Sequence, residues 1–298
     1  MKHLLSIETI AVADMQSILS SALTLKQQRG RHPAQSLLGQ AWALIFTKPS
    51  TRTRVSFEVG IRELGGQVMF LSSTDIQLGR GEPIKDTARV LGRMLHGAVI
   101  RTFAQRDVEE FAQFALIPTI NALTDQEHPC QILTDIFTYQ EKRGPIEGQV
   151  VAYIGDGASN VPLSWMFAAG KLGFELRIAA PKAFQPSQEM LGRAGGRVFV
   201  TESPKEAARG ANLLYTDVWV SMGKEEESAA RLQQLTGYQI NQSLLAVARP
   251  GALVMHCLPA YRGKEIDETT FEQHAPTIFD QAENRLHVQK AVLNWLVS

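Results

Sequence analysis

The chain has 298 residues, a length that suits one large domain or two ordinary ones. Apolar residues make up 44% of it and charged residues 20%, which is typical of a globular protein with a sizeable core and excludes a disordered chain. Because 30 Lys and Arg residues balance 30 Asp and Glu residues, no net basic field favours nucleic acid or an acidic membrane surface. Any anion site must therefore come from the local placement of arginines.

The two cysteines, Cys130 and Cys257, are too few for a disulfide framework in a chain of this size and fit a reducing cytosol. Glu8 interrupts the apolar run that a signal peptide would continue. No stretch approaches the roughly 18 consecutive apolar residues that a membrane-spanning helix needs. The sequence therefore predicts a soluble cytoplasmic protein that binds neither membrane nor nucleic acid.

Short apolar runs alternate with helical patterns along the first half of the chain. The run 41–46 predicts a buried strand, and Phe57, Ile61 and Leu64 predict one face of a helix over 51–64. Further strands are expected at 68–71, 98–101 and 119–122, followed by a helix over 130–141.

The polar, helix-breaking segment 142–145 is the expected domain boundary. Beyond it the alternation resumes, so that the second half is also predicted to build a parallel sheet with helices on both faces. The strands are expected at 149–154, 175–179, 212–215 and 252–256, and the helices at 161–172 and 284–297.

The expected fold is α/β, with two doubly wound parallel-sheet domains and a cleft between them. The first domain is expected to cover 1–141, and the second 145–280. The terminal helix within 284–298 is expected to pack back on the first domain. In such folds ligands bind at the carboxyl ends of the strands, so the functional residues are expected there.

The segment 48–54, with the sequence Lys-Pro-Ser-Thr-Arg-Thr-Arg, lies where a predicted strand ends and a helix begins. Backbone N–H groups and the helix dipole favour an anion at such a position, and the hydroxyl groups add donors. Arg52 and Arg54 offer planar, charged forks that suit phosphate oxygens. The alternative is an N-capped surface helix with two solvated arginines. The strand-to-helix context favours a phosphate-like anion.

Two further segments follow predicted strands of the same half. Arg101 ends the strand 98–101, and His128-Pro129-Cys130-Gln131 comes after the strand 119–122 at the start of the next helix. A lone Arg or His is more often structural. Because the carboxyl ends of parallel strands share one edge of a sheet, three such segments together favour one anion site.

The segments 50–54 and 128–131 resemble the carbamoyl phosphate site of the aspartate and ornithine transcarbamylase family. Asp217-Val218-Trp219-Val220-Ser221-Met222-Gly223 and His256-Cys257-Leu258-Pro259 are similar to segments of its ornithine branch. The four segments occur in the family's order, and the resemblance covers essentially the whole chain. It implies transfer of the carbamoyl group of carbamoyl phosphate to the δ-amine of L-ornithine, giving L-citrulline and phosphate in arginine biosynthesis or catabolism.

The resemblance also implies a homotrimer, or a multiple of trimers, that needs neither an organic cofactor nor a metal ion. The loop 75–82 is similar to a family loop that reaches into a neighbouring subunit's site; read alone, it is an exposed polar hairpin. Arg285 matches a family arginine at the start of the last helix.

The resemblance implies a set of site residues. The implied catalytic residues are Arg101, His128, Cys257 and Arg285. The residues implied to contact carbamoyl phosphate are Ser50, Thr51, Arg52, Thr53, Gln77, Arg101, His128, Gln131, Cys257, Leu258 and Arg285. Those implied to contact ornithine are Asn160, Asp217, Ser221 and Met222.

Two other interpretations of these motifs are weaker. The segment 155–160, Gly-Asp-Gly-Ala-Ser-Asn, suggests a dinucleotide fingerprint, but Asn160 takes the place of its last glycine. The neighbours His256 and Cys257 suggest a nucleophilic pair, but adjacent strand residues point to opposite faces, and carbamoylation of an amine needs no covalent intermediate.

Three rival functions remain open from the sequence. One is a transcarbamylase that acts on another amine, such as N-acetylornithine or putrescine. The second is a non-catalytic relative that binds carbamoyl phosphate as a sensor or scaffold. The third is a nicotinamide-dependent dehydrogenase. Putrescine is disfavoured because it has no α-carboxylate or α-amine for the segment 217–223 to recognise.

Overall fold

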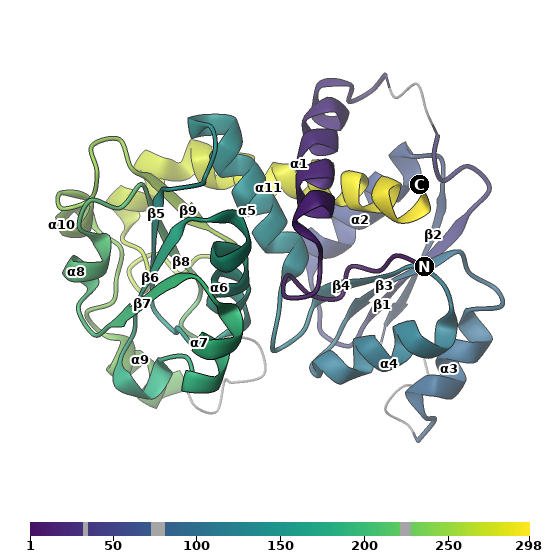
Figure 1. The fold of residues 1–298 in the computed structure, drawn as a ribbon, viewed down its shortest axis with the longest axis horizontal. Helices are drawn as coiled ribbons and strands as arrows, with labels where there is room; N and C mark the ends of the chain where they lie inside the picture. The colour runs from purple at the N-terminus through teal and green to yellow at the C-terminus, as the bar shows by residue number, and fades with distance from the viewer. Residues whose placement is uncertain (32–34, 73–80, 221–227) are drawn as a thin grey trace. The chain divides into compact units, whose positions relative to one another are not determined.

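The computed structural model describes residues 1–31, 35–72, 81–220 and 228–298. These residues form two compact units (Figure 1), each with one parallel β-sheet. The first unit comprises Met1–Phe137 and Asn284–Ser298, and the second comprises Thr138–Glu283. The predicted α/β class with two parallel sheets is confirmed. Within the described ranges, no helix is both long and apolar enough to cross a membrane.

The first unit holds a four-stranded sheet with the order β2-β1-β3-β4. From β1 the chain moves outward to β2 and then returns to the other side of β1. The strand order therefore reverses between β1 and β3, which is where open α/β sheets bind ligands. The strands are β1 (Ala41–Phe46), β2 (Gln67–Ser72), β3 (Gly97–Arg101) and β4 (Thr119–Leu123).

Helices cover both faces of this sheet, with α3 and α4 on one face and α1 and α2 on the other (Figure 1). Side chains at alternating strand positions, such as Ala43 and Ile45, pack in one apolar cluster with Val108 and Phe111 of α4. This period of two is what the pleat of a strand requires. The helices are α1 (Val12–Gln27), α2 (Thr51–Glu63), α3 (Ile84–Leu91), α4 (Gln105–Ala115) and α5 (Pro129–Arg143), the last of which continues into the second unit.

The second unit holds a five-stranded sheet with the order β7-β6-β5-β8-β9, which reverses between β5 and β8. Its edge strand β7 was not predicted from the sequence. The central residue of β7, Phe199, is exposed, as an edge position allows. The strands are β5 (Val150–Ile154), β6 (Glu175–Ala179), β7 (Arg197–Thr201), β8 (Leu213–Thr216) and β9 (Leu253–His256).

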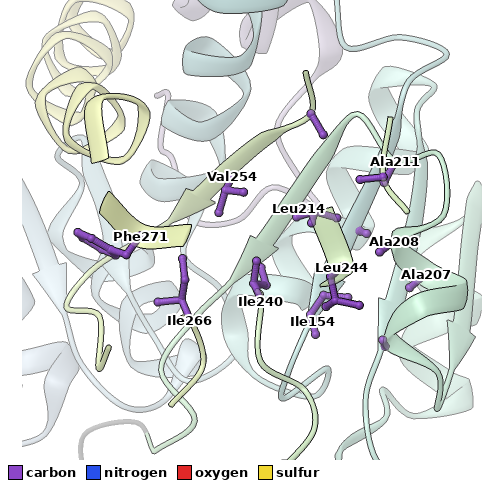
Figure 2. Packing of buried hydrophobic residues seen from close by; sticks show 14 of the residues in the cluster. Ile154, Ala207, Ala208, Ala211, Leu214, Ile240, Leu244, Val254, Ile266 and Phe271 are labelled. Atoms are coloured by element: carbon purple, nitrogen blue, oxygen red, sulfur yellow. The ribbon is translucent and has the colours of Figure 1, made fainter. Parts of the chain in front are cut away.

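The core of the second unit lies against β5, β8 and β9. Figure 2 shows Ile154, Leu214 and Val254 of these strands with Ala208 of α8 and Leu244 of α10 in one buried cluster. The small alanines let the short helix α8 approach the sheet closely. The helical segments are α6 (Asn160–Leu172), the 3-10 turn η1 (Lys182–Phe184), α7 (Gln188–Ala194), α8 (Pro204–Ala208), α9 (Ser228–Leu235) and α10 (Gln242–Leu245).

The last helix, α11, spans Glu268–Val297 and contains Pro276. The prediction that it begins at residue 284 was wrong. Asp267 caps the helix much earlier, because its Oδ1 accepts the Thr270 N–H at 2.6 Å, and the helix continues past the proline. Arg285 therefore lies inside α11 and not at its start.

The end of α11 packs on the first unit, as predicted. The Lys290 ammonium group donates to Glu63 at 2.6 Å, and Lys26 donates to Asn284 Oδ1 at 2.8 Å. The Trp295 indole N–H donates to Asp14 at 2.8 Å. These contacts hold Arg285 against α2 and α5.

Candidate functional site

The predicted anion segment lies at the junction of β1 and α2. Ser50 is the N-cap of α2: its Oγ accepts the Thr53 N–H at 3.3 Å and donates to Thr53 Oγ1 at 2.9 Å. The first N–H groups of a helix have no acceptor within the helix and point toward an approaching anion. The N-cap that the alternative interpretation expected is therefore present. The cap and the donor array occupy the same turn.

The two arginines of this segment differ in their surroundings. Arg54 donates to Glu58 at 2.7 Å, four residues along α2, and its guanidinium lies 3.8 Å from the centre of the Phe70 ring. Arg54 is thus paired on α2 and against Phe70, and the expectation that its guanidinium offers a fork to phosphate stays a prediction. Arg52, at the second position of the helix, is partly exposed.

Arg285 connects the segment to α5. One arm of its guanidinium, Nη2, donates to Thr53 Oγ1 at 2.7 Å, and the other, Nη1, donates to Gln131 Oε1 at 3.2 Å. Gln131 Nε2 in turn donates to Asp135 at 2.8 Å. Arg285 thus joins Thr53 and Gln131, and the sequence assigned all three residues to one ligand. Asp135 was not predicted, and its only sequence signal is its spacing of four residues from Gln131.

Arg101 and His128 lie in the same region. Arg101 ends β3 and is 5% exposed, and His128 directly precedes α5 and is 4% exposed. Burial lowers the pKa of His128 well below 6.5, and the positive charges of Arg285 and Arg101 lower it further. The imidazole is therefore neutral at physiological pH, and His128 can donate a hydrogen bond without carrying a charge.

The pKa of His128 predicts a pH-dependent stability. A depressed pKa contributes stability that is present above the unfolded value of 6.5 and is lost as pH falls through the folded pKa. Relative to His128→Gln, the wild type should therefore lose about 1 to 2 kcal/mol of unfolding free energy between pH 7.5 and pH 5. Urea unfolding of both proteins at the two pH values measures this difference, and an unchanged difference would contradict the prediction.

Lys48, which the sequence placed in the anion segment without a role of its own, is 5% exposed. Its ammonium group pairs with Asp125 and lies 4.1 Å from the centre of the Phe103 ring. Lys48 therefore adds a positive charge near the carboxyl ends of β1, β3 and β4.

In the second unit, Asp217 follows β8 and contacts Cys257 after β9. The Cys257 thiol donates to Asp217 Oδ1 at 2.8 Å, and the Val218 N–H donates to the same oxygen at 2.7 Å. Asp217 as a residue is partly exposed, but its carboxylate is enclosed. Loss of hydration is the largest influence on that carboxyl and raises its pKa above the ordinary 3.8.

Both ring nitrogens of His256 have hydrogen-bond partners other than Asp217 and Cys257. Its Nδ1 accepts the Leu258 N–H at 2.9 Å, so its Nε2 carries the proton and donates to Glu265 at 3.1 Å. The arrangement fixes the turn after β9, where Leu258 has a left-handed φ of 58°. Since the Cys257 thiol contacts Asp217, the structure gives no support to a Cys257–His256 nucleophilic pair. Asp217, His256 and Cys257 each offer one potential metal-ligand atom, and these atoms lie within 4.8 Å of one another. A metal ion bound there would have to displace a hydrogen bond of His256.

Asn160 is the first residue of α6, next to the loop that follows β5. In that loop Asp156 accepts the Ala158 N–H at 3.1 Å and pairs with the buried guanidinium of Arg231. Arg231 also donates to the Trp219 carbonyl at 3.1 Å. A buried ion pair that the sequence did not predict therefore ties the loop before Asn160 to the segment that contains Asp217. A Cβ at Gly157 would meet Ile178 at 2.6 Å, so the loop needs glycine there.

The remaining sequence predictions cannot be placed. Gln77, Ser221 and Met222 lie outside the described residues.

Two open parallel sheets with donor-rich carboxyl ends define the class, and comparison with known proteins supplies the family. The model of the carbamoyl-P binding domain of aspartate/ornithine carbamoyltransferases matches residues 2–141, and the model of the Asp/Orn binding domain matches 147–296. The chain therefore belongs to the aspartate/ornithine carbamoyltransferase family, and the resemblance drawn from the sequence is confirmed.

Individual ornithine carbamoyltransferases are similar to this chain over nearly its whole length. An ornithine carbamoyltransferase of Akkermansia muciniphila is 55% identical over 98% of this chain and 97% of its own length. The structure of the anabolic ornithine carbamoyltransferase of Campylobacter jejuni superposes with a TM-score of 0.94 at 41% identity and covers 99% of both chains. The structure of the ornithine carbamoyltransferase of Pyrococcus furiosus superposes with a TM-score of 0.92 at 41% identity and covers 99% of this chain and 97% of its own.

Proposed function

We propose that this protein transfers the carbamoyl group of carbamoyl phosphate to the δ-amine of L-ornithine, giving L-citrulline and phosphate. The observation that carries this proposal is the set in which Arg285 joins Thr53 of α2 to Gln131 of α5. It gathers cationic and neutral donors beside a helix N-terminus, which suits a small, doubly charged anion with a carbonyl group. The full-length similarity to ornithine carbamoyltransferases supports the same reaction.

We assign most of the carbamoyl phosphate contacts to the first unit, and those of Cys257 and Leu258 to the second. The phosphate would contact the first turn of α2, where backbone N–H groups and Arg52 offer donors. The carbamoyl oxygen would accept from Arg101, Arg285 and the neutral His128. The proposed carbamoyl phosphate contacts are Ser50, Thr51, Arg52, Thr53, Gln77, Arg101, His128, Gln131, Cys257, Leu258 and Arg285.

We assign ornithine to the second unit, through Asn160, Asp217, Ser221 and Met222. The carboxylate of Asp217 would accept hydrogen bonds from an ammonium group of the substrate, while Asn160 would donate to its α-carboxylate. Ornithine's δ-amine has a lysine-like reference pKa of about 10.4 and is mostly protonated at neutral pH. It must lose that proton before it attacks, so groups that orient the neutral amine promote the reaction.

The chemical step follows from these assignments. The nitrogen lone pair attacks the carbonyl carbon, a C–N bond forms, and negative charge develops on the carbonyl oxygen. Donors fixed in advance on that oxygen stabilise this charge. The C–O bond to phosphate then breaks, the phosphate leaves with the bonding electrons, and the nitrogen loses its second proton to solvent.

We also propose that the protein works in the cytoplasm as a homotrimer or a multiple of trimers, with Gln77 contributing to a neighbouring subunit's site. Sedimentation equilibrium should then give three chain masses or a multiple of three. A monomer or dimer at assay concentration would overturn this assembly.

The function is tested by following citrulline formation from carbamoyl phosphate and ornithine, beside N-acetylornithine and putrescine as competing amines. We expect kcat/KM to be highest for ornithine, because of these three amines only ornithine offers the second unit both a free α-ammonium group and an α-carboxylate beside its δ-amine. A higher kcat/KM for putrescine or N-acetylornithine would reassign the amine. Tight binding of carbamoyl phosphate without turnover of any amine would favour a sensor, and binding of a nicotinamide nucleotide would favour a dehydrogenase.

A further inference from the structure

We propose that Asp135 is a positioning residue for carbamoyl transfer, which orients Gln131 and, through Gln131, the guanidinium of Arg285. This inference rests on the proposed function, since Gln131 and Arg285 are assigned there to carbamoyl phosphate. Asp135 lies one turn along α5 from Gln131 and is 0% exposed. Its Oδ1 accepts from Gln131, so Asp135 acts on the substrate through that neighbour.

The contacts form a continuous chain across three helices. Asp135 Oδ1 accepts from Gln131 Nε2 at 2.8 Å, and Gln131 Oε1 accepts from Arg285 Nη1 at 3.2 Å. Arg285 Nη2 continues to Thr53 Oγ1 at 2.7 Å, which is itself held by the N-cap Ser50. Helices α5, α11 and α2 are thereby joined at the residues assigned to carbamoyl phosphate.

The chemistry at the two ends of Gln131 permits only one orientation of its amide. An ionised carboxylate only accepts hydrogen bonds, and a guanidinium only donates them. With Nε2 toward Asp135 and Oε1 toward Arg285, both bonds form. A rotation of the amide by 180° would place oxygen against the carboxylate and N–H₂ against the guanidinium, and both bonds would be lost. The acceptor that Asp135 Oδ1 provides therefore determines which face Gln131 presents to Arg285.

Stability alone does not account for a carboxylate at this position. Removal of a carboxyl group from water is unfavourable, and apolar residues of similar volume often replace a buried ionic group without loss of stability. The placement of Asp135 against a ligand-binding amide gives this buried carboxyl group a use. Removal of Asp135 frees Gln131 to rotate and deprives Arg285 of a fixed partner on its Nη1 side.

The test compares two ligands of the same site. Carbamoyl phosphate engages both the phosphate donors and the carbamoyl donors, whereas inorganic phosphate engages only the phosphate donors. In Asp135→Ala we expect the affinity for carbamoyl phosphate to fall about 10- to 100-fold, as for a lost hydrogen bond to a charged group, and the affinity for inorganic phosphate to change less than threefold. Asp135→Asn keeps a neutral acceptor and should recover part of the loss.

The matched control is Thr134→Val, on the same helix and also fully buried, whose hydroxyl donates to the Cys130 carbonyl at 2.7 Å and not to Gln131. It should leave the ratio of the two affinities unchanged. A double-mutant cycle adds a second measurement: in a Gln131→Leu background, Asp135→Ala should lower carbamoyl phosphate affinity no further, because its effect passes through Gln131.

Binding of carbamoyl phosphate by the wild type is measured first, and its absence would overturn the proposed function together with this inference. If the wild type binds, equal affinity in Asp135→Ala, or a parallel loss for both ligands, would overturn the inference alone. If Asp135→Ala does not fold, Asp135→Asn decides in its place, with a selective loss of at least threefold for carbamoyl phosphate expected and an unchanged affinity ratio contradicting the proposal.

Discussion

Replacement of Arg285 by methionine is expected to lower kcat/KM for carbamoyl phosphate about a thousandfold, the upper range for loss of one donor to a developing oxyanion. Arg285 is 4% exposed, and its two arms reach Thr53 and Gln131 from inside α11. A guanidinium held on both sides does not have to reorganise when charge develops beside it. Methionine keeps much of the volume and removes the charge, and citrulline formation at saturating ornithine measures the effect.

The control for Arg285→Met is Arg89→Met. Arg89 lies on α3 of the same unit, has an exposed side chain and pairs with Asp86 at 3.0 Å. We expect kcat/KM within twofold of wild type, because an exposed pair of this kind contributes little. The melting temperature of each variant separates loss of catalysis from loss of fold. A folded Arg285→Met enzyme within tenfold of wild type would remove Arg285 from the catalytic assignment.

The strands were predictable because burial leaves a simple pattern. The run 41–46 is apolar throughout, and β1 has these bounds, while the other predicted strands agree to within one residue at each end. Strand β7 was not predicted because it is an edge strand with an exposed Phe199 and has no continuous apolar run. The start of α11 was not predicted because Pro276 interrupts the helical pattern. Asp267 and Thr270 nevertheless form a helix cap there.

The residues that lie together in the candidate site could be predicted from the sequence, but the hydrogen bonds between them could not. Topology alone brings the ends of β1, β3 and β4 to one edge, so Thr53, Arg101 and His128 could be grouped from the sequence. The hydrogen-bond partner of each side chain depends on packing, which the sequence pattern does not give. Arg54 pairs with Glu58 and lies against the Phe70 ring. Asp135 has the pattern of a surface carboxylate on a helix, but it is fully buried.

Replacement of Asp217 by asparagine is expected to lower kcat/KM for ornithine about a thousandfold, within the range for loss of a positioned ionised group. Asparagine is of the same size and can still accept from Cys257, but it cannot attract an ammonium group. Loss of hydration raises the pKa of Asp217 above the ordinary 3.8, so the wild-type kcat/KM should fall on the acid side at a higher pH than an ordinary carboxyl would give. That portion of the pH profile should be absent in Asp217→Asn.

Stability provides the independent check on Asp217. An acid whose folded pKa is raised contributes stability that is present below the unfolded value of 3.8 and is lost as pH rises through the folded pKa. At neutral pH the ionised carboxylate therefore weakens the fold, and Asp217→Asn should unfold at the same urea concentration as wild type or a higher one. The control Asp280→Asn removes a carboxylate that pairs with Lys142 at 2.6 Å and should leave kcat/KM within twofold of wild type. An Asp217→Asn protein that loses stability and activity together would indicate a structural role, whereas lost activity with retained stability is what a carboxylate kept for ornithine requires.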